Sequence, residues 1–335
     1  MTERLRVGIV AGGPSSEHEI SCISAGGILS AIDRSKYEPV LVGITKTGVW
    51  VLPDQNMTLS IVDGILPVMD ESSPRTADLG ADLELDILFP ALHGAYGEDG
   101  TFQRFCDLAG ITYVGSGAKA SELAMDKSES KKAFEKVGLK VAAGIDVFNA
   151  ESVDTSALGL PLFVKPARGG SSRGTTKVKS VDALIPAIKE ALEFDSKVMI
   201  ERAIVGREIE CAVLERNGEL LASPVGEIRI LGNHEFYDFE AKYLDNSTEL
   251  VTPVELPDGA QAEIQSQAKK AFAAIGCAGL ARVDFFYTQN GEIVINEINT
   301  MPGFTSTSVY PKLMATTGIG YTELISALIE SALIK

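Results

Sequence analysis

One stretch of the chain decides its fold and much of its chemistry: ARVDFFYTQNGEIVINEINT, residues 281–300. Residues 283–287 and 292–298 are rich in the aromatic and β-branched side chains that favour strands. The pair Asn290-Gly291 between them is the strongest short signal for a β-hairpin. The stretch is therefore predicted to form two antiparallel strands joined by a two-residue loop.

The loop length fixes which residues of this hairpin face one another. With a two-residue loop, Asp284 lies opposite Glu297, and Arg282 lies opposite Asn299. Side chains alternate between the two faces of a sheet, so all four should project from the same face. Two facing carboxylates, with Cβ atoms about 5 Å apart, repel each other. Either Arg282 neutralises a solvated polar face, or the Asp, Glu and Asn oxygens hold Mg²⁺ or Mn²⁺ that also binds a phosphate.

A second candidate site is the glycine- and serine-rich loop KPARGGSSRG, residues 165–174. It offers backbone N–H groups, hydroxyls and cations, as a loop that covers phosphates needs. It is not a P-loop, because Thr175 stands where that motif has its lysine. The alternative is a mobile, solvated loop. Lys165 favours phosphate binding, because it ends an apolar strand where an unused lysine would be costly.

Composition excludes several classes of protein. The net charge of −16 argues against a nucleic-acid surface, which needs a basic patch. The 4 cysteines form no CxxC pair, which indicates reduced thiols rather than disulfides or a zinc site, and 3 histidines are too few for a histidine-based metal site. No apolar segment approaches the length of a membrane span and no signal peptide is evident, so we expect a cytoplasmic protein without a membrane partner.

The length of 335 residues indicates more than one compact unit. In the first unit, residues 1–118, strand patterns alternate with helical ones, which predicts a parallel sheet covered by helices. Within it, residues 52–82 are weakly patterned and are interpreted as a surface insertion with little catalytic content. The second unit, residues 119–201, carries the glycine-rich loop. The third, residues 202–335, is a mixed α+β unit that carries the hairpin.

Local signals predict individual elements. Ser15 or Ser16 is placed to cap the first helix. The charge-rich segment Ala120–Val137 is predicted to be one helix, with further helices at residues 181–193 and 321–334. Strands other than those of the hairpin are expected at residues 5–10, 36–44, 86–92, 162–164, 175–178 and 197–201.

Short motifs are spread along nearly the whole chain. They are GGPSSE (12–17), LHGAYGEDG (92–100), YVGS (113–116), MDK (125–127), VKP (164–166), YDFEAKY (237–243), RVD (282–284) and NEINTMPG (296–303). Together, and in this order, they resemble the ATP-grasp superfamily and, within it, the D-alanine–D-alanine ligases. The resemblance implies a three-domain fold of α/β and α+β type. An N-terminal parallel-sheet domain would be followed by two ATP-grasp subdomains.

The resemblance also implies a two-step reaction. ATP phosphorylates the carboxylate of a first D-alanine, and the amine of a second D-alanine attacks the acyl phosphate through a tetrahedral intermediate. ADP, phosphate and a dipeptide for peptidoglycan synthesis result. Two Mg²⁺ ions (or Mn²⁺) would assist, and a homodimer is the expected assembly. The metal ligands implied are Asp284, Glu297 and Asn299.

Matching positions imply roles for further residues. Lys127 and Lys165 would neutralise phosphates, and Glu208 would accept the ribose hydroxyls. The ATP-binding set implied is Lys127, Lys165, Glu201, Ala203, Ile204 and Glu208.

The resemblance also assigns the two amino-acid substrates. Glu17, supported by Ser171 and Tyr243, would bind the ammonium of the first D-alanine, with His93 near its carboxylate. Arg282 and the Gly303 N–H would stabilise the oxyanion. Lys242 would meet the transferred phosphate, and Ser308 the second carboxylate. The implied catalytic set is Glu17, Ser171, Tyr243, Arg282 and Gly303, and the implied substrate-binding set is His93, Lys242 and Ser308.

Each of these residues also has a simpler interpretation when it is taken alone. Glu17 could be a first-turn carboxylate favoured by the helix dipole, and His93 a turn residue. Tyr243 could be a half-buried core side chain and Lys127 a solvated helix lysine. Only their co-occurrence favours function.

Two alternatives to D-alanine ligation remain open from the sequence. One is a ligase of the same fold that takes D-lactate or D-serine as second substrate. The other is a nucleotide-binding module without catalysis. Arg173 and Arg202 also depart from the family, which more often has an aliphatic residue and a lysine there.

Overall fold

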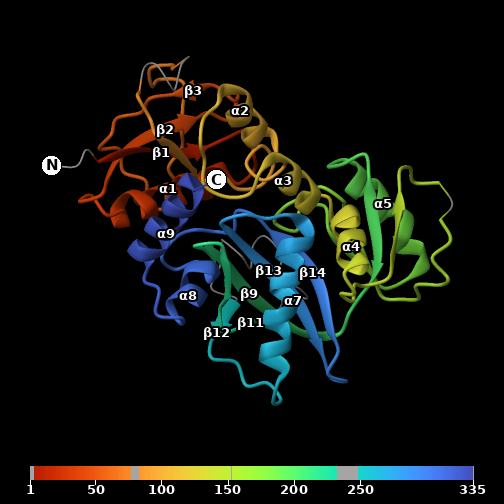
Figure 1. The fold of residues 1–335 in the computed structure, drawn as a ribbon. Helices are drawn as coiled ribbons and strands as arrows, with labels where there is room; N and C mark the ends of the chain where they lie inside the picture. The colour runs from red at the N-terminus through yellow and green to blue at the C-terminus, as the bar shows by residue number, and fades with distance from the viewer. Residues whose placement is uncertain (1–3, 77–82, 152, 232–247, 335) are drawn as a thin grey trace.

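The computed structural model describes residues 4–76, 83–151, 153–231 and 248–334, which form three sheets with covering helices (Figure 1). The N-terminal sheet and the sheet of the central part of the chain lie at opposite ends of the molecule in Figure 1, and the C-terminal sheet lies between them. Among the described residues, no helix is long and apolar enough to cross a membrane.

The N-terminal sheet has the strand order β3-β2-β1-β4. Its region contains β1 (Leu5–Gly12), α1 (His18–Ala31), β2 (Tyr37–Ile44), β3 (Trp50–Val51), β4 (Ile87–Pro90) and α2 (Thr101–Ala109). β1 is parallel to both β2 and β4, whereas β3 is antiparallel to β2. The predicted parallel sheet is confirmed for the three longer strands, and β3 was not predicted.

The start of α1 differs from the prediction. Glu17 occupies the cap position, and no side chain caps the helix. Ser15 Oγ instead accepts a hydrogen bond from the Glu17 N–H at 3.1 Å and donates one to the His93 carbonyl at 2.7 Å. The predicted cap by Ser15 or Ser16 was therefore wrong. Ser15 ties the turn after β1 to the turn after β4.

Residues 52–76, the described part of the predicted insertion, have little regular structure. Leu59 and Met69 are nevertheless buried in the N-terminal core. The Met69 N–H also donates a hydrogen bond to His18 Nε2 at 2.9 Å. The interpretation as a surface insertion was wrong for these two anchors, and residues 77–82 lie outside the described residues.

The central sheet is antiparallel, has the order β5-β8-β6-β7 and is covered by α5. The elements here are α3 (Ala118–Met125), α4 (Lys127–Lys136), β5 (Gly144–Val147), β6 (Leu162–Pro166), β7 (Thr176–Val178), a 3-10 turn (Val181–Ala183), α5 (Leu184–Leu192) and β8 (Val198–Arg202). β5 was not predicted.

The segment Ala120–Val137, predicted as one helix, belongs to two helices that meet at Asp126. The backbone of Asp126 is extended (φ −80°, ψ 98°), and its carboxylate accepts hydrogen bonds from the N–H groups of Ser128 and Glu129. This side chain is therefore the N-cap of α4. The break places Lys127 in the first turn of α4, where it reaches the glycine-rich loop.

The C-terminal sheet is six-stranded and antiparallel, with the order β12-β11-β9-β13-β14 and β10 paired to β9. Its region contains β9 (Gly206–Arg216), β10 (Glu219–Ala222), β11 (Gly226–Ile230), β12 (Thr248–Val251), α7 (Ala260–Ile275), β13 (Leu280–Thr288), β14 (Ile293–Asn299), α8 (Val309–Ala315) and α9 (Tyr321–Leu333).

The two faces of this sheet have different partners. Ile209, Cys211 and Val213 of β9 pack in one buried cluster with the apolar side of α7. The alternate residues Glu208 and Glu210 face the other way, toward a cleft. Figure 1 shows α7 lying across one face of this sheet.

Helices α8 and α9 return to the N-terminal sheet. One buried cluster contains Ile9 and Phe89 of that sheet together with three residues from this part of the chain. They are Phe304, which precedes α8, Tyr310 of α8 and Leu328 of α9. The rings of Phe89 and Phe304 lie 5.6 Å apart. This shared core fixes the segment just after β14 against the N-terminal turns.

Candidate active site

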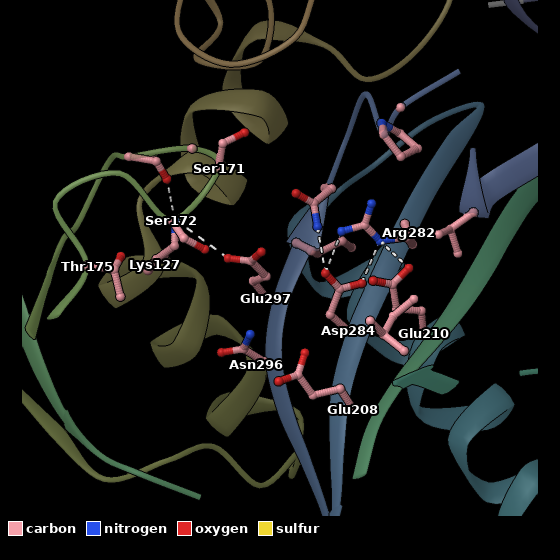
Figure 2. A pocket seen from close by; sticks show the side chains of 18 of the residues that line it. Lys127, Ser171, Ser172, Thr175, Glu208, Glu210, Arg282, Asp284, Asn296 and Glu297 are labelled. Atoms are coloured by element: carbon pink, nitrogen blue, oxygen red, sulfur yellow. Dashed lines mark hydrogen bonds and ion pairs between the residues drawn. The ribbon is translucent and has the colours of Figure 1, made fainter. Parts of the chain in front are cut away.

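One cleft of about 830 Å³ lies where the three sheets meet (Figure 2). All predicted site residues that the structure describes line it, from each of the three predicted units. Lys242 and Tyr243 lie outside the described residues. The lining set is Glu17, His93, Lys127, Lys165, Ser171, Glu201, Ala203, Ile204, Glu208, Arg282, Asp284, Glu297, Asn299, Gly303 and Ser308.

The hairpin pairs Asp284 with Glu297 and Arg282 with Asn299, as predicted, but not by the predicted route. The Thr288 N–H donates to the Glu292 carbonyl at 3.0 Å, so the loop has three residues, 289–291, rather than two. Phe285 consequently pairs with Ile295, one position out of the predicted register. A β-bulge between Asp284 and Phe285 restores the register at the site. The loop prediction was wrong, and the bulge offsets the error.

The hairpin face is a network of charges. Arg282 holds Asp284 with two hydrogen bonds, Nε to Oδ1 at 2.8 Å and Nη2 to Oδ2 at 2.7 Å. Arg282 Nε also lies 3.0 Å from Glu210 Oε2, and Asn299 Nδ2 donates to Asp284 Oδ2 at 3.1 Å. Figure 2 shows the side chains of Arg282, Asp284 and Glu210 close together. Neutralisation by Arg282, the alternative interpretation of the facing carboxylates, thus accounts for Asp284.

Glu297 is balanced by a different cation. Its Oε2 lies 3.6 Å from Lys127 Nζ, which also donates to the Gly169 carbonyl at 2.5 Å. Lys127 therefore joins the hairpin, α4 and the glycine-rich loop, as Figure 2 shows. The lysine side chain is 14% exposed, so it is largely covered rather than solvated, unlike a surface helix lysine.

The donor set fits a hard divalent cation whose coordination is completed by phosphate and water. In the described ranges of the chain, no three His, Cys, Asp or Glu side chains are grouped closely enough to hold a metal by themselves. Asp284, Glu297 and Asn299 supply two carboxylates and an amide on one face. Mg²⁺ commonly takes only one or two carboxylates and keeps waters and phosphate oxygens for the rest.

Glu210 is a carboxylate of this face that the sequence did not bring forward. It lies directly opposite Asp284 across the β9–β13 ladder and is 4% exposed. The alternation Glu208-Ile209-Glu210 was the available signal, because in a strand it would place two carboxylates on one face.

The opposite end of the cleft has a surplus of lysine. Glu201 of β8 is 4% exposed, and its two carboxylate oxygens pair separately with Lys131 Nζ and Lys165 Nζ. Burial alone would raise the pKa of Glu201, but the two ammonium groups outweigh burial and bring that pKa to about 2. Lys131 was not predicted as a site residue.

The residues next to Glu201 include one departure from the family that the structure explains. Arg202 Nε donates a hydrogen bond to the Leu158 carbonyl at 2.7 Å, so its guanidinium is bound to the loop that precedes β6. The Ala203 N–H donates to the Pro161 carbonyl at 3.1 Å. Arg173, the other departure, lies over the Phe194 ring at 5.7 Å.

Glu17 and Ser171 are brought together from the first turn after β1 and the glycine-rich loop. Ser171 Oγ donates to Glu17 Oε1 at 2.5 Å, and Glu17 is 6% exposed. Ser171 has a left-handed backbone (φ 50°), which turns its hydroxyl toward the N-terminal side of the cleft. The predicted partnership of these two residues is a contact in the structure.

His93 bridges the N-terminal turn and the segment after β14. Its Nδ1 lies 3.1 Å from the Met301 carbonyl, and its Nε2 lies 2.8 Å from Ser24 Oγ. Burial lowers the pKa of His93, against the opposing charge of Glu17. The neutral ring must donate from Nδ1, because a carbonyl can only accept, so Nε2 accepts from Ser24. His93 is thus a buried bridge as well as a cleft residue.

Glu98 is a second carboxyl that the sequence did not bring forward. Its Oε1 accepts from the Gly94 N–H at 2.7 Å, and its Oε2 lies 3.4 Å from the Met301 N–H. Burial, and then the charge of Glu17, raise the pKa of Glu98 to about 8. His93 and Glu98 together hold both peptide groups of Met301, two residues before Gly303.

Gly303 and Ser308 lie close together at the far side of the cleft. Ser308 Oγ accepts from the Thr305 N–H at 3.0 Å. A Cβ atom at Gly303 would lie 3.2 Å from Ser308 Oγ. A side chain at position 303 would therefore press on Ser308, which explains why glycine suits this position.

Comparison with known families decides the relationship. The family described as D-ala D-ala ligase N-terminus matches residues 6–116, and that described as D-ala D-ala ligase C-terminus matches residues 149–330. The chain belongs to the D-alanine–D-alanine ligase family. The predicted resemblance is confirmed.

Relatives within the family span the whole chain. A protein of Mycolicibacterium vanbaalenii named D-alanine–D-alanine ligase is 47% identical in an alignment 363 positions long, which covers 100% of this chain and 99% of the relative. A protein of Mycobacterium tuberculosis with the same name is 46% identical and covers 99% of this chain and 96% of the relative.

Solved structures of the family share the fold. The D-alanine–D-alanine ligase of Coxiella burnetii has a TM-score of 0.82 at 32% identity, covering 99% of this chain and 95% of that one. The VanG D-Ala:D-Ser ligase of Enterococcus faecalis has a TM-score of 0.83 at 34% identity, covering 98% and 100%. The Bacillus anthracis ligase complexed with ATP has a TM-score of 0.77 at 30% identity, covering 98% of each chain. The predicted α/β, α+β ATP-grasp fold is confirmed.

Proposed function

We propose that this chain joins two D-alanine molecules to D-alanyl-D-alanine, with ATP as the energy source. The observation that carries the proposal is that all described family residues converge in one and the same cleft. Membership of the family, with relatives of 44–47% identity named D-alanine–D-alanine ligase over nearly their whole length, supports the same activity.

ATP is assigned to the part of the cleft between the central and C-terminal sheets. The base would lie at Glu201, Ala203 and Ile204, with Glu208 at the ribose. The phosphates would meet Lys127, Lys165 and the N–H groups of the glycine-rich loop. An ATP complex of the Bacillus anthracis relative, at 30% identity, supports this assignment.

Asp284, Glu297 and Asn299 are assigned to two Mg²⁺ ions. When bound, the ions would neutralise charge on the transferred phosphoryl group. The facing carboxylates of the hairpin and the neighbouring Glu210 give this end of the cleft the negative charge that such cations need.

The first D-alanine is assigned to the pocket of Glu17 and Ser171. The family resemblance also assigns Tyr243 to its ammonium and Lys242 to the transferred phosphate. The ammonium of this D-alanine would pair with Glu17, which leaves its carboxylate to attack the γ-phosphorus of ATP. The new phosphorus–oxygen bond forms as the bond to ADP breaks, and an acyl phosphate results.

The second D-alanine attacks that acyl phosphate with its neutral amine. The carbonyl oxygen becomes an oxyanion, which Arg282 and the Gly303 N–H would stabilise, while Ser308 holds the second carboxylate. Collapse of the intermediate expels phosphate, and the amine proton is lost to solvent. The hold of His93 and Glu98 on Met301 keeps the Gly303 segment in place for this step.

The test is direct. The purified chain, incubated with ATP, Mg²⁺ and D-alanine, should release phosphate and form the dipeptide in equal amounts. Absence of both products would overturn the proposal and would favour a module that binds nucleotide without catalysis.

The choice of second substrate needs its own measurement, because a D-Ala:D-Ser ligase shares the fold. D-alanine should outcompete D-serine and D-lactate at neutral pH when all are present with ATP. Preferential formation of the D-serine product or of the ester with D-lactate would shift the proposal to that substrate.

The proposal extends to location and assembly, for which the family resemblance is the support. We place the enzyme in the cytoplasm as a homodimer of three-domain chains divided near residues 118 and 201. Light scattering of the purified chain should give twice the mass of 35.6 kDa; the monomer mass would overturn the dimer.

A further inference from the structure

Lys131 is a buried cation beside Glu201, at the end of the cleft that the proposed function assigns to the base of ATP (the base end). Neither the sequence analysis nor the proposed mechanism assigns a role to Lys131. It lies on α4 one turn after Lys127, so the two lysines share one face of that helix. Its side chain is 7% exposed, and its ammonium pairs with Glu201 Oε2. A lysine is rarely buried to this extent unless a partner requires it.

The environment of Glu201 contains one cation more than a carboxylate needs. Lys165 of β6 pairs with Oε1 and Lys131 of α4 pairs with Oε2, so the two oxygens are held from two different elements. The three side chains are 6–10% exposed. Burial, and the charge of Lys165, lower the pKa of Lys131, whereas Glu201 opposes both.

ATP would change this balance. Lys165 begins the glycine-rich loop, and in the proposed function it neutralises phosphate. A lysine that is engaged by a polyanion can no longer neutralise Glu201 fully. Without Lys131, a buried carboxylate would then be short of a partner and would take up a proton.

We propose that Lys131 is a positioning residue that keeps Glu201 ionised and fixed while Lys165 engages phosphate, so that Glu201 selects a purine with a 6-amino group. An ionised carboxylate accepts a hydrogen bond from that amino group and repels a 6-oxo group. A protonated carboxyl can donate to a 6-oxo group, so loss of Lys131 relaxes selection. The inference rests on the proposed assignment of this cleft to ATP.

The test compares equilibrium binding of ATP and of inosine triphosphate, which has a 6-oxo group, by calorimetry in the absence of D-alanine. The chain should prefer ATP. Lys131→Met should lower the ratio of the two affinities by about tenfold, the scale of one hydrogen bond to a charged group. Lys131→Arg should keep most of the ratio.

Lys132→Met is the matched control, because Lys132 is the next residue of the same helix but is 56% exposed and pairs with Glu129 at 2.8 Å outside the cleft. It should leave the ratio unchanged. An unchanged ratio in Lys131→Met, or an equal loss in the control, would overturn the proposal.

A double-mutant cycle separates positioning from a general effect on packing. Glu201→Gln should by itself abolish the preference, since an amide can donate to a 6-oxo group. Adding Lys131→Met to that variant should cost little more. Additive losses, or a preference that survives Glu201→Gln, would contradict the inference, and the second result does so even if Lys131→Met does not fold.

These measurements need no turnover. A chain that selects ATP through Lys131 but forms no dipeptide would refute the proposed function and leave the inference intact. If the chain forms the dipeptide but Lys131→Met and Glu201→Gln both keep the preference for ATP, the inference is refuted and the proposed function stands.

Discussion

The two ends of the cleft carry opposite surplus charge, and they differ in how the chain builds them. At the hairpin end, Glu210, Asp284 and Glu297 lie on three adjacent strands, with Arg282 beside the first two and Lys127 beside the third. At the base end, the carboxylate of Glu201 pairs with the ammonium groups of Lys131 on α4 and Lys165 on β6. The carboxylate end suits cations and the lysine end suits an anion, which is the charge pattern that the proposed Mg²⁺ and ATP assignments require.

The largest effect is expected from Asp284→Asn, which removes a carboxylate from the hairpin end while keeping its shape. Phosphate release with D-alanine should fall about a thousandfold, because the variant loses charge that would hold Mg²⁺ at the phosphates. Glu292→Gln, on the same hairpin but 49% exposed and paired with Lys140, is the control and should be close to unchanged. If the rate of phosphate release by Asp284→Asn falls by less than about tenfold, the carboxylates of the hairpin end do not have the role that we assign to them.

Arg282→Met should be the most damaging to stability. It leaves Asp284 and Glu210 facing each other, buried and without their arginine, and the free energy of unfolding should fall by about 3 kcal/mol. Adding Glu210→Gln should recover part of that loss. Arg207→Met is the control, since Arg207 pairs with Glu227 on the same sheet but is 35% exposed, and it should cost at most about 1 kcal/mol. Urea unfolding checks all three variants; equal losses in the two arginine variants would contradict the account.

Lys165→Met tests the base end, where we expect the opposite of Arg282→Met: little loss of stability but weaker ATP binding. Here the chain has a surplus lysine, so its removal should change the free energy of unfolding by less than about 1 kcal/mol, because Glu201 keeps Lys131. ATP affinity should nevertheless fall by about tenfold or more, since a phosphate loses its cation. A large loss of stability with unchanged ATP affinity would show that this lysine is structural.

Glu98 adds a pH dependence to the comparison, because it lies near Glu17 and Arg282 at the N-terminal side of the cleft. Its pKa of about 8 means that the folded chain binds a proton there more tightly than the unfolded chain does. Its stabilising contribution is therefore complete at acid pH and is lost as the pH rises from about 4.5 to 8. Relative to Glu98→Gln, the chain should lose up to about 1 kcal/mol per pH unit across that range, as measured by urea unfolding. A difference that does not vary with pH would contradict the raised pKa.

The same contrast explains what the sequence could predict. The facing of Asp284 and Glu297 followed from alternation within one hairpin, although the loop has three residues and a bulge restores the pairing. Lys131 and Glu98 were missed because each acquires its surroundings from distant segments: Glu201 lies 70 positions from Lys131, and Met301 lies 203 from Glu98. No local pattern encodes such an approach.

The break between α3 and α4 was missed for another physical reason. The composition of residues 120–137 is helical throughout, and only the Asp126 side chain, by capping the N–H groups of Ser128 and Glu129, ends one helix and begins the next. Asp is also tolerated inside helices, so the sequence alone does not distinguish the two cases. The break sets where Lys127 points, and its ammonium thereby reaches the Gly169 carbonyl and Glu297.

The central claim is that this cleft activates a D-alanine carboxylate by phosphorylation and then joins it to a second D-alanine. The most direct measurement uses D-alanine labelled with ¹⁸O in its carboxylate, together with ATP and Mg²⁺, and mass spectrometry of the released phosphate. The account predicts one ¹⁸O atom in each phosphate and one dipeptide for each phosphate, because the labelled oxygen bridges the acyl phosphate. Phosphate without label, or no dipeptide, would contradict it.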